Sequence, residues 1–80
     1  MNTTNEFFGF EKALVLLKQG KSLARKGWNG KDLLVQAQFP TPDSKMTLPY
    51  LYIEYPNGAK CPWLASQTDL MSEDWFEVIK

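Results

Sequence analysis

Two short segments of this 80-residue chain carry the side chains best suited to holding a ligand. The first is Gly27-Trp28-Asn29-Gly30-Lys31, with Arg25 just before it. Trp28 offers a flat face for stacking, the Asn29 amide can hydrogen-bond to a base edge, and Arg25 can make a bidentate contact with a phosphate. Each residue also has a plainer alternative. A neighbouring subunit or the following loop can cover Trp28, Asn29 can simply build a turn, and Arg25 can pair with a nearby carboxylate.

The second segment is Pro62-Trp63-Leu64-Ala65-Ser66-Gln67-Thr68-Asp69. A serine followed three residues later by a carboxylate predicts the start of a helix at Ser66, and the unpaired N–H groups of such a start suit a phosphate. Gln67 adds both donor and acceptor groups, and Trp63 lies just before the cap. The alternatives are that Ser66 and Asp69 form an ordinary capping box and that Trp63 belongs to the core.

The sequence favours binding over catalysis. It contains no His, which is the commonest general base, and its single thiol, Cys61, therefore has no imidazole to activate it. Asp69 and Asp74 are the remaining acid–base pair, but carboxylates near a predicted cap and turn more often serve local hydrogen bonding. With one Cys and no Gly-rich phosphate loop, disulfide, structural zinc and phosphate-loop chemistry are also disfavoured. We expect a non-enzymatic binding protein without cofactor or metal.

The composition sets further bounds on partners and location. Nine basic residues balance nine acidic ones, and a net charge of zero argues against binding to duplex nucleic acid. The N-terminus lacks a basic start and no apolar stretch has the length of a membrane span, so we expect a cytoplasmic protein without membrane association. Three Trp, three Tyr and five Phe are many for a chain this small to enclose, which predicts self-association.

The apolar spacing predicts one domain over residues 1–80, with residues 1–9 as a flexible N-terminal extension. Phe10, Ala13, Leu14 and Leu17 lie at i, i+3, i+4 and i+7, which indicates a helix over 10–19 that Gly20 ends. Asn29-Gly30 then predicts a tight hairpin turn between strands at 21–26 and 33–39.

Alternating residues predict three further strands, at 50–55, 59–63 and 75–79, with a turn at 56–58 and a short helical turn after Ser66. Trp75 is expected in the core because it lies in an alternating strand. The expected architecture is an α+β domain: a small, mostly antiparallel sheet of about five strands, packed with one N-terminal helix and a short second helical turn.

Four sequence segments, taken in order, closely resemble one protein family. They are Phe10-x-x-Ala13-Leu14-x-x-Leu17-Lys18-x-Gly20-Lys21, Ala24-Arg25-Lys26-Gly27-Trp28-Asn29-Gly30-Lys31, Pro62-Trp63-x-Ala65-Ser66-Gln67-x-Asp69 and Asp74-Trp75. The family is the phage and prophage family that includes the second type of Thoeris anti-defence protein.

The resemblance implies a homotetrameric sponge that sequesters a cyclic nucleotide immune signal without cleaving it. The signal would be a cyclic ADP-ribose isomer, and some members also bind cyclic oligonucleotides at a separate site. In this interpretation Trp28 and Trp63 stack on or enclose the adenine ring, and Arg25 and the amides near Ser66 bind phosphate. Asn29, Gln67 and Asp69 contact base edges and ribose hydroxyls. The implied ligand-binding residues are Arg25, Trp28, Asn29, Trp63, Ser66, Gln67 and Asp69. The alternative function is a small phage or prophage module that binds a host protein through exposed aromatic residues.

Overall fold

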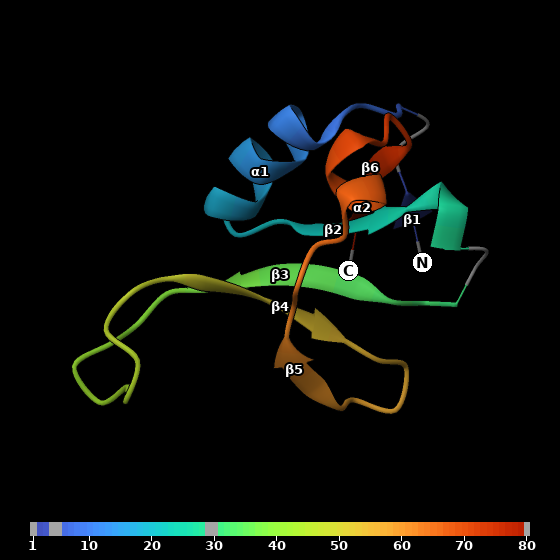
Figure 1. Ribbon diagram of the computed structural model, residues 1–80. Helices are drawn as coiled ribbons and strands as arrows, with labels where there is room; N and C mark the ends of the chain where they lie inside the picture. Colours follow the sequence, from blue (N-terminus) through green and yellow to red (C-terminus); the bar gives the residue numbers. More distant parts are fainter. Residues whose placement is uncertain (1, 4–5, 29–30, 80) are drawn as a thin grey trace.

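The computed structural model describes residues 2–3, 6–28 and 31–79. These residues form a six-stranded antiparallel sheet with two helices on one side of it (Figure 1). The strand order is β1-β6-β2-β3-β4-β5, so the last strand in the sequence lies between the first two. The predicted α+β class is confirmed. Among the described residues, no helix has the length and apolar character needed to cross a membrane.

The two helices form where the sequence indicates them. Helix α1 covers Phe10–Lys18, and Gly20 follows it with a φ of 90°, the left-handed conformation that glycine adopts without steric cost. Helix α2 covers Gln67–Met71 and begins after Ser66. The predictions of a helix over 10–19 and of a helical turn after Ser66 are both confirmed.

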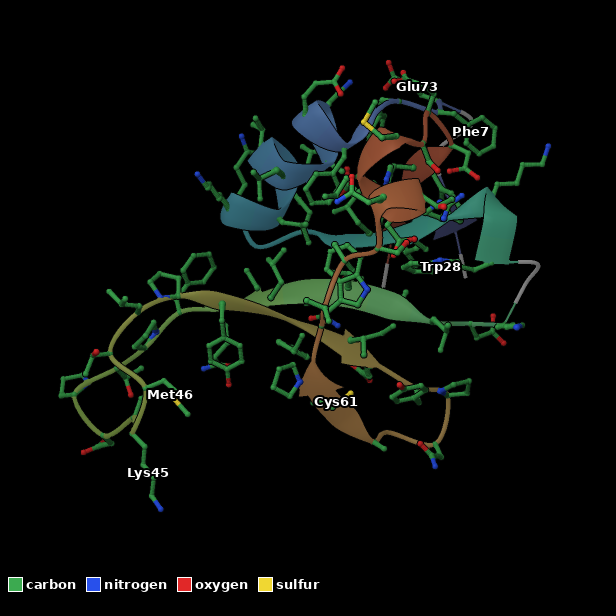
Figure 2. All side chains as sticks on the ribbon, in the orientation of Figure 1. Phe7, Trp28, Lys45, Met46, Cys61 and Glu73 are labelled. Carbon is green, nitrogen blue, oxygen red and sulfur yellow. The ribbon has the colours of Figure 1, made fainter. Side chains whose placement is uncertain are left out.

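Strands β3 (Leu34–Gln38), β4 (Tyr50–Glu54) and β5 (Lys60–Pro62) form a meander. The segment between β3 and β4 extends away from the rest of the molecule as an arm, with Lys45 and Met46 at its far end (Figure 2). The short β5 lies at one edge of the sheet, a position that tolerates proline because the ladder needs no N–H on the outer side.

The predicted antiparallel pairing of the two strands on either side of Asn29-Gly30 is confirmed, with Leu23 opposite Val35. The predicted turn residues themselves lie outside the described residues. Strand β2 covers Ser22–Arg25, the 3-10 helix η1 covers Lys26–Trp28, and β3 starts only at Leu34, so the connection runs from residue 26 to residue 33. The N–H of Lys26 donates to the Asp74 carbonyl over 3.0 Å, which holds the chain beyond β2 against the start of β6. This connection, longer than a two-residue turn, is thus held in part by a residue that is distant in the sequence.

Strand β6 (Trp75–Ile79) pairs on one side with β2 and on the other with β1 (Asn2–Thr3). An isolated bridge also joins Phe8 to Trp75. Part of the N-terminal segment, expected as a flexible extension, therefore belongs to the sheet.

The core lies between α1 and the sheet. Trp75, predicted to be core, is fully buried there. Burial of these apolar side chains is the main driving force for the fold. The other members of the buried cluster are Ala13, Leu17, Leu23, Val35 and Ile53.

Candidate ligand site

Arg25 links the two segments that the sequence singles out. Its Nη1 donates to Asp69 Oδ1 over 2.8 Å, and its Nε donates to Asp74 Oδ1 over 2.9 Å. Only 12% of the Arg25 side chain is exposed, so water screens these ion pairs weakly. We call Arg25, Asp69 and Asp74 the ionic brace. It joins the end of β2 to α2 and to the residue before β6.

The brace keeps its three groups charged. The hydrogen bond from Arg25 to Asp74 raises the pKa of Arg25 most, and its other contacts with the two carboxylates raise it further, despite the opposing effect of burial. Burial alone raises the pKa of Asp69, but hydrogen bonds from Ser66 and Arg25 outweigh it and leave that pKa lowered. Burial acts likewise on Asp74, whose pKa is also lowered, by Arg25 and by the Gly27 N–H.

Ser66 and Asp69 form the capping box of α2. The Asp69 N–H donates to Ser66 Oγ over 3.0 Å, and the Ser66 N–H donates to Asp69 Oδ2 over 3.1 Å. Both Asp69 oxygens therefore have partners, one in the cap and one in the brace. The polar groups of this segment act first in positioning α2.

Trp75 is the centre of an aromatic cluster next to the brace. Trp28 packs edge-on against it with a centroid distance of 5.4 Å, and Trp63 does so at 5.8 Å. Phe10 of α1 contacts both Trp63 and Trp75. The Trp75 Nε1–H donates to the Asp69 carbonyl over 2.9 Å, which ties the cluster to α2.

A cavity of about 420 Å³ lies on the side of the sheet away from the core. The register places Ala24 opposite Phe76, and both residues line the cavity together with Leu34 and Val78. Because successive side chains of a strand point to opposite faces, the neighbours Leu23, Val35 and Trp75 point into the core instead. The sheet thus has a helix-covered face and a cavity face.

The rim of the cavity is polar and carries both charges. Lys26, Trp28 and Lys31 contribute from the β2–β3 connection, and Glu54 and Tyr55 contribute from the end of β4. Figure 2 shows Trp28 on the β2–β3 connection, on the same side of the molecule as the start of β3. An indole close in sequence to two lysines suits a flat ring that carries phosphate, and a carboxylate suits hydroxyl or amino donors.

Glu54 is held in a hydrogen-bonded row on the cavity face. Gln36 Nε2 donates to Glu54 Oε1 over 3.0 Å, and the Tyr52 hydroxyl donates to Gln36 Oε1 over 3.3 Å. Within residues 2–3, 6–28 and 31–79, no group of three or more His, Cys, Asp or Glu side chains is arranged to hold a metal ion. The side chains that line the cavity offer stacking, hydrogen bonding and charge pairing.

Residues 8–78 match the Thoeris anti-defense 2-like domain. The chain belongs to this family. It is also 28% identical over 82 aligned residues to Thoeris anti-defense 2 of Bacillus phage SP01, an alignment that covers 82% of this chain and 89% of the phage protein. Membership of the Thoeris anti-defense 2-like family supports an anti-defence role.

Within this family member, the residues expected to bind ligand separate into two groups. Arg25 and Trp28 line the cavity, and Trp28 reaches Trp63 through Trp75. The others, on and just before α2, do not line the cavity: Ser66 and Asp69 make the capping box, and Gln67 is exposed. Asn29 lies outside the described residues. The plainer alternative for Arg25, pairing with carboxylates, is the one that the structure shows.

Several cavity residues were not selected from the sequence. Lys26 and Lys31 lie on either side of Trp28 in the sequence, and their positive charge could have indicated that they bind a phosphate. Glu54, Tyr55 and Phe76 had no such signal, because they reach the cavity only through the pairing of β2 with β6 and of β3 with β4.

Proposed function

We propose that this protein is an anti-defence sponge that binds a cyclic nucleotide immune signal, such as a cyclic ADP-ribose isomer, and withholds it without cleaving it. The observation that carries the proposal is the cavity beside Trp28 in a chain of the Thoeris anti-defense 2-like family. Its volume of about 420 Å³ falls within the range of small-molecule sites.

The cavity offers a matching group for each part of such a ligand. Trp28 stacks on the adenine ring, and Lys26 and Lys31 pair with the pyrophosphate. Glu54 accepts hydrogen bonds from ribose hydroxyls or from an amino group, and it lies away from the phosphates because like charges repel. The apolar floor of Ala24 and its neighbours excludes water beneath the ring.

The state of the acidic residues supports sequestration rather than hydrolysis. Asp69 and Asp74 are both paired with Arg25, and the pKa of each is lowered, whereas a general acid near neutral pH needs a raised carboxyl pKa. Cys61 is exposed, and the chain contains no His that could activate its thiol.

Assembly into a cytoplasmic homotetramer is part of the proposal. Large apolar side chains such as Met46, Leu48 and Leu64 are strongly exposed, and burial against other copies would remove them from water. Light scattering coupled to size exclusion tests this part directly, and a monomer at micromolar concentration would refute it.

Calorimetry tests the sponge itself. Cyclic ADP-ribose isomers and cyclic di- and trinucleotides are titrated into the protein, and the complex is then heat-denatured and its released ligand run on chromatography. We expect stoichiometric capture with a nanomolar dissociation constant, about −12 kcal/mol, and return of the intact ligand. Cleaved product would indicate a hydrolase, and absence of heat with every nucleotide would refute the sponge.

Two variants locate the binding. Trp28→Ala removes the stacking face and should abolish capture, whereas Gln19→Ala removes an exposed polar side chain away from the cavity and should leave capture unchanged. Size exclusion of both variants is compared with the wild type. Loss of the oligomer in Trp28→Ala would show that Trp28 acts structurally instead.

A second candidate is a module that binds a host protein. The specific observation in its favour is the arm between β3 and β4, which together with its ends carries four exposed large apolar side chains: Phe39, Met46, Leu48 and Tyr50. If no nucleotide binds, this candidate predicts that substitutions on the arm, rather than Trp28→Ala, abolish anti-defence activity in infected cells.

A further inference from the structure

Asp74 holds three successive residues of the turn that carries Trp28. Its Oδ1 accepts from Arg25 Nε over 2.9 Å, and its Oδ2 accepts from the Gly27 N–H over 2.8 Å. Its backbone carbonyl accepts from the Lys26 N–H over 3.0 Å. One residue, just before β6, thereby fixes the backbone immediately before Trp28.

Gly27 makes this close approach feasible. A Cβ added at Gly27 would lie 2.8 Å from Arg25 Nη2 and 2.9 Å from Asp74 Oδ2, closer than real Cβ atoms come to such neighbours. A larger residue would displace either the ends of these two side chains or the turn itself, and either shift would disturb the short hydrogen bond. The glycine and the aspartate therefore operate as a pair.

Both ends of this contact lead to the cavity. Lys26 and Trp28, on either side of Gly27, line its rim, while Phe76, two residues after Asp74, lines its floor. Asp74 itself does not line the cavity. Its influence on a ligand must pass through the residues that it holds.

We propose that Asp74 is a positioning residue, which holds the Gly27 backbone so that Trp28 and Lys26 already form the wall of the cavity before a ligand enters. This inference rests on the proposed function for its effect on affinity. When the wall is ordered in the free protein, binding does not have to order it. When it is not, only a fraction of the molecules can bind ligand at any time, and the apparent affinity falls in proportion to that fraction.

The charge and the double acceptor are both needed at this position. An ionised carboxylate accepts hydrogen bonds at both oxygens, whereas an amide accepts at one atom and donates at the other. In Asp74→Asn, either the Gly27 N–H or Arg25 Nε therefore faces an NH₂ group. The pair between Arg25 and Asp69 is untouched by this change, which keeps α2 attached to β2.

The test compares Asp74→Asn with the matched control Asp43→Asn, which removes the same charge on the exposed arm. Two-dimensional amide and indole NMR spectra are recorded for the free proteins, and affinity for a cyclic ADP-ribose isomer is measured by calorimetry. We expect Asp74→Asn to shift the Gly27 amide and Trp28 indole signals while the core amide signals of Leu17 and Val35 stay in place. Affinity should fall about tenfold or more, and saturating ligand should bring the Trp28 signal of the variant to its position in the wild-type complex.

A purely structural role would not produce that recovery of the Trp28 signal. Wild-type affinity in Asp74→Asn, or equal weakening in Asp43→Asn, would overturn the proposal. If Asp74→Asn does not fold, hydrogen exchange of the wild-type Gly27 amide decides: strong protection in the free protein supports the preformed wall, and exchange at the rate of an unfolded chain overturns it.

The outcome remains separable from that of the proposed function. If no nucleotide binds the wild type, the sponge is refuted, but the Trp28 shift in Asp74→Asn and the Gly27 protection still report whether Asp74 positions the wall. If the wild type binds and neither NMR change occurs, the positioning role fails while the sponge stands.

Discussion

Replacing Arg25 by Met should destabilise the protein far more than removing an exposed ion pair. The substitution keeps a flexible apolar stem but leaves two carboxylates without their cation. Asp69 is buried and Asp74 is 30% exposed at its side chain, so neither is freely solvated. Breaking a buried ion pair at one partner typically costs about 3–5 kcal/mol of unfolding free energy.

The structure places the expected loss at the lower end of that range, about 3 kcal/mol. Asp69 keeps the Ser66 N–H and Asp74 keeps the Gly27 N–H, which continue to stabilise both negative charges. Proteins of this size have roughly 4–12 kcal/mol of total stability, so a large share is at stake. The melting temperature should fall by about 12–24 °C.

Urea denaturation followed by tryptophan fluorescence measures the loss, at one fixed subunit concentration because oligomers unfold in a concentration-dependent way. The control is Lys12→Met, which breaks a 3.2 Å pair with Glu6 whose side chains are 47% and 66% exposed. That change should cost less than about 1 kcal/mol. An Arg25→Met protein within about 0.5 kcal/mol of the wild type, or one no worse than Lys12→Met, would refute the reasoning.

Three further outcomes follow from the same contacts. Replacing Lys26 and Lys31 together by Ala should weaken nucleotide binding and reduce the salt dependence of the dissociation constant measured by calorimetry. A salt dependence equal to that of the wild type would show that the phosphates bind away from these two lysines. Because the pKa values of Asp69 and Asp74 are lowered in the folded state, the unfolded chain binds more protons in acid. The brace therefore contributes its full stability above about pH 4, where unfolded aspartates are ionised, and this contribution declines as the pH falls further. The urea midpoint should show the decline in the wild type, and the decline should be smaller in Arg25→Met. Leu17→Ala, at a fully buried position, should cost about 2–5 kcal/mol in the same urea assay, and a smaller loss would indicate that α1 packs loosely.

Local patterns predicted the helices and most strands of this protein because those elements depend on neighbouring residues. The spacing of Phe10 to Leu17 and the Ser66–Asp69 capping box are examples, and both are present as expected. The pattern around Asn29-Gly30 also predicted the pairing of β2 with β3, but not the contact of Lys26 with Asp74, more than forty residues away in the sequence. Turn chemistry alone carries no information about such a partner.

The strand order was equally out of reach. Nothing in the period-two pattern of Trp75–Ile79 indicates that this strand pairs with β2 on one side and β1 on the other. The cavity face is a product of that pairing, since Phe76 and Ala24 become neighbours only in this register. Sequence reasoning therefore found Arg25 and Trp28, which a local motif contains, and missed the residues that the sheet brings to them.

The end of β2 explains why stability and binding should be linked in this fold. Ala24 contributes to the cavity floor, while the next residue, Arg25, turns its guanidinium toward α2 and Asp74. The chain then passes Gly27, which Asp74 holds, and reaches Trp28 at the cavity rim. A change in the brace thus alters the support of the cavity without touching a ligand. For this reason loss of binding in an Arg25 variant is not evidence of a contact between Arg25 and phosphate, and only a variant that loses affinity while keeping its urea midpoint identifies a residue that meets the ligand directly.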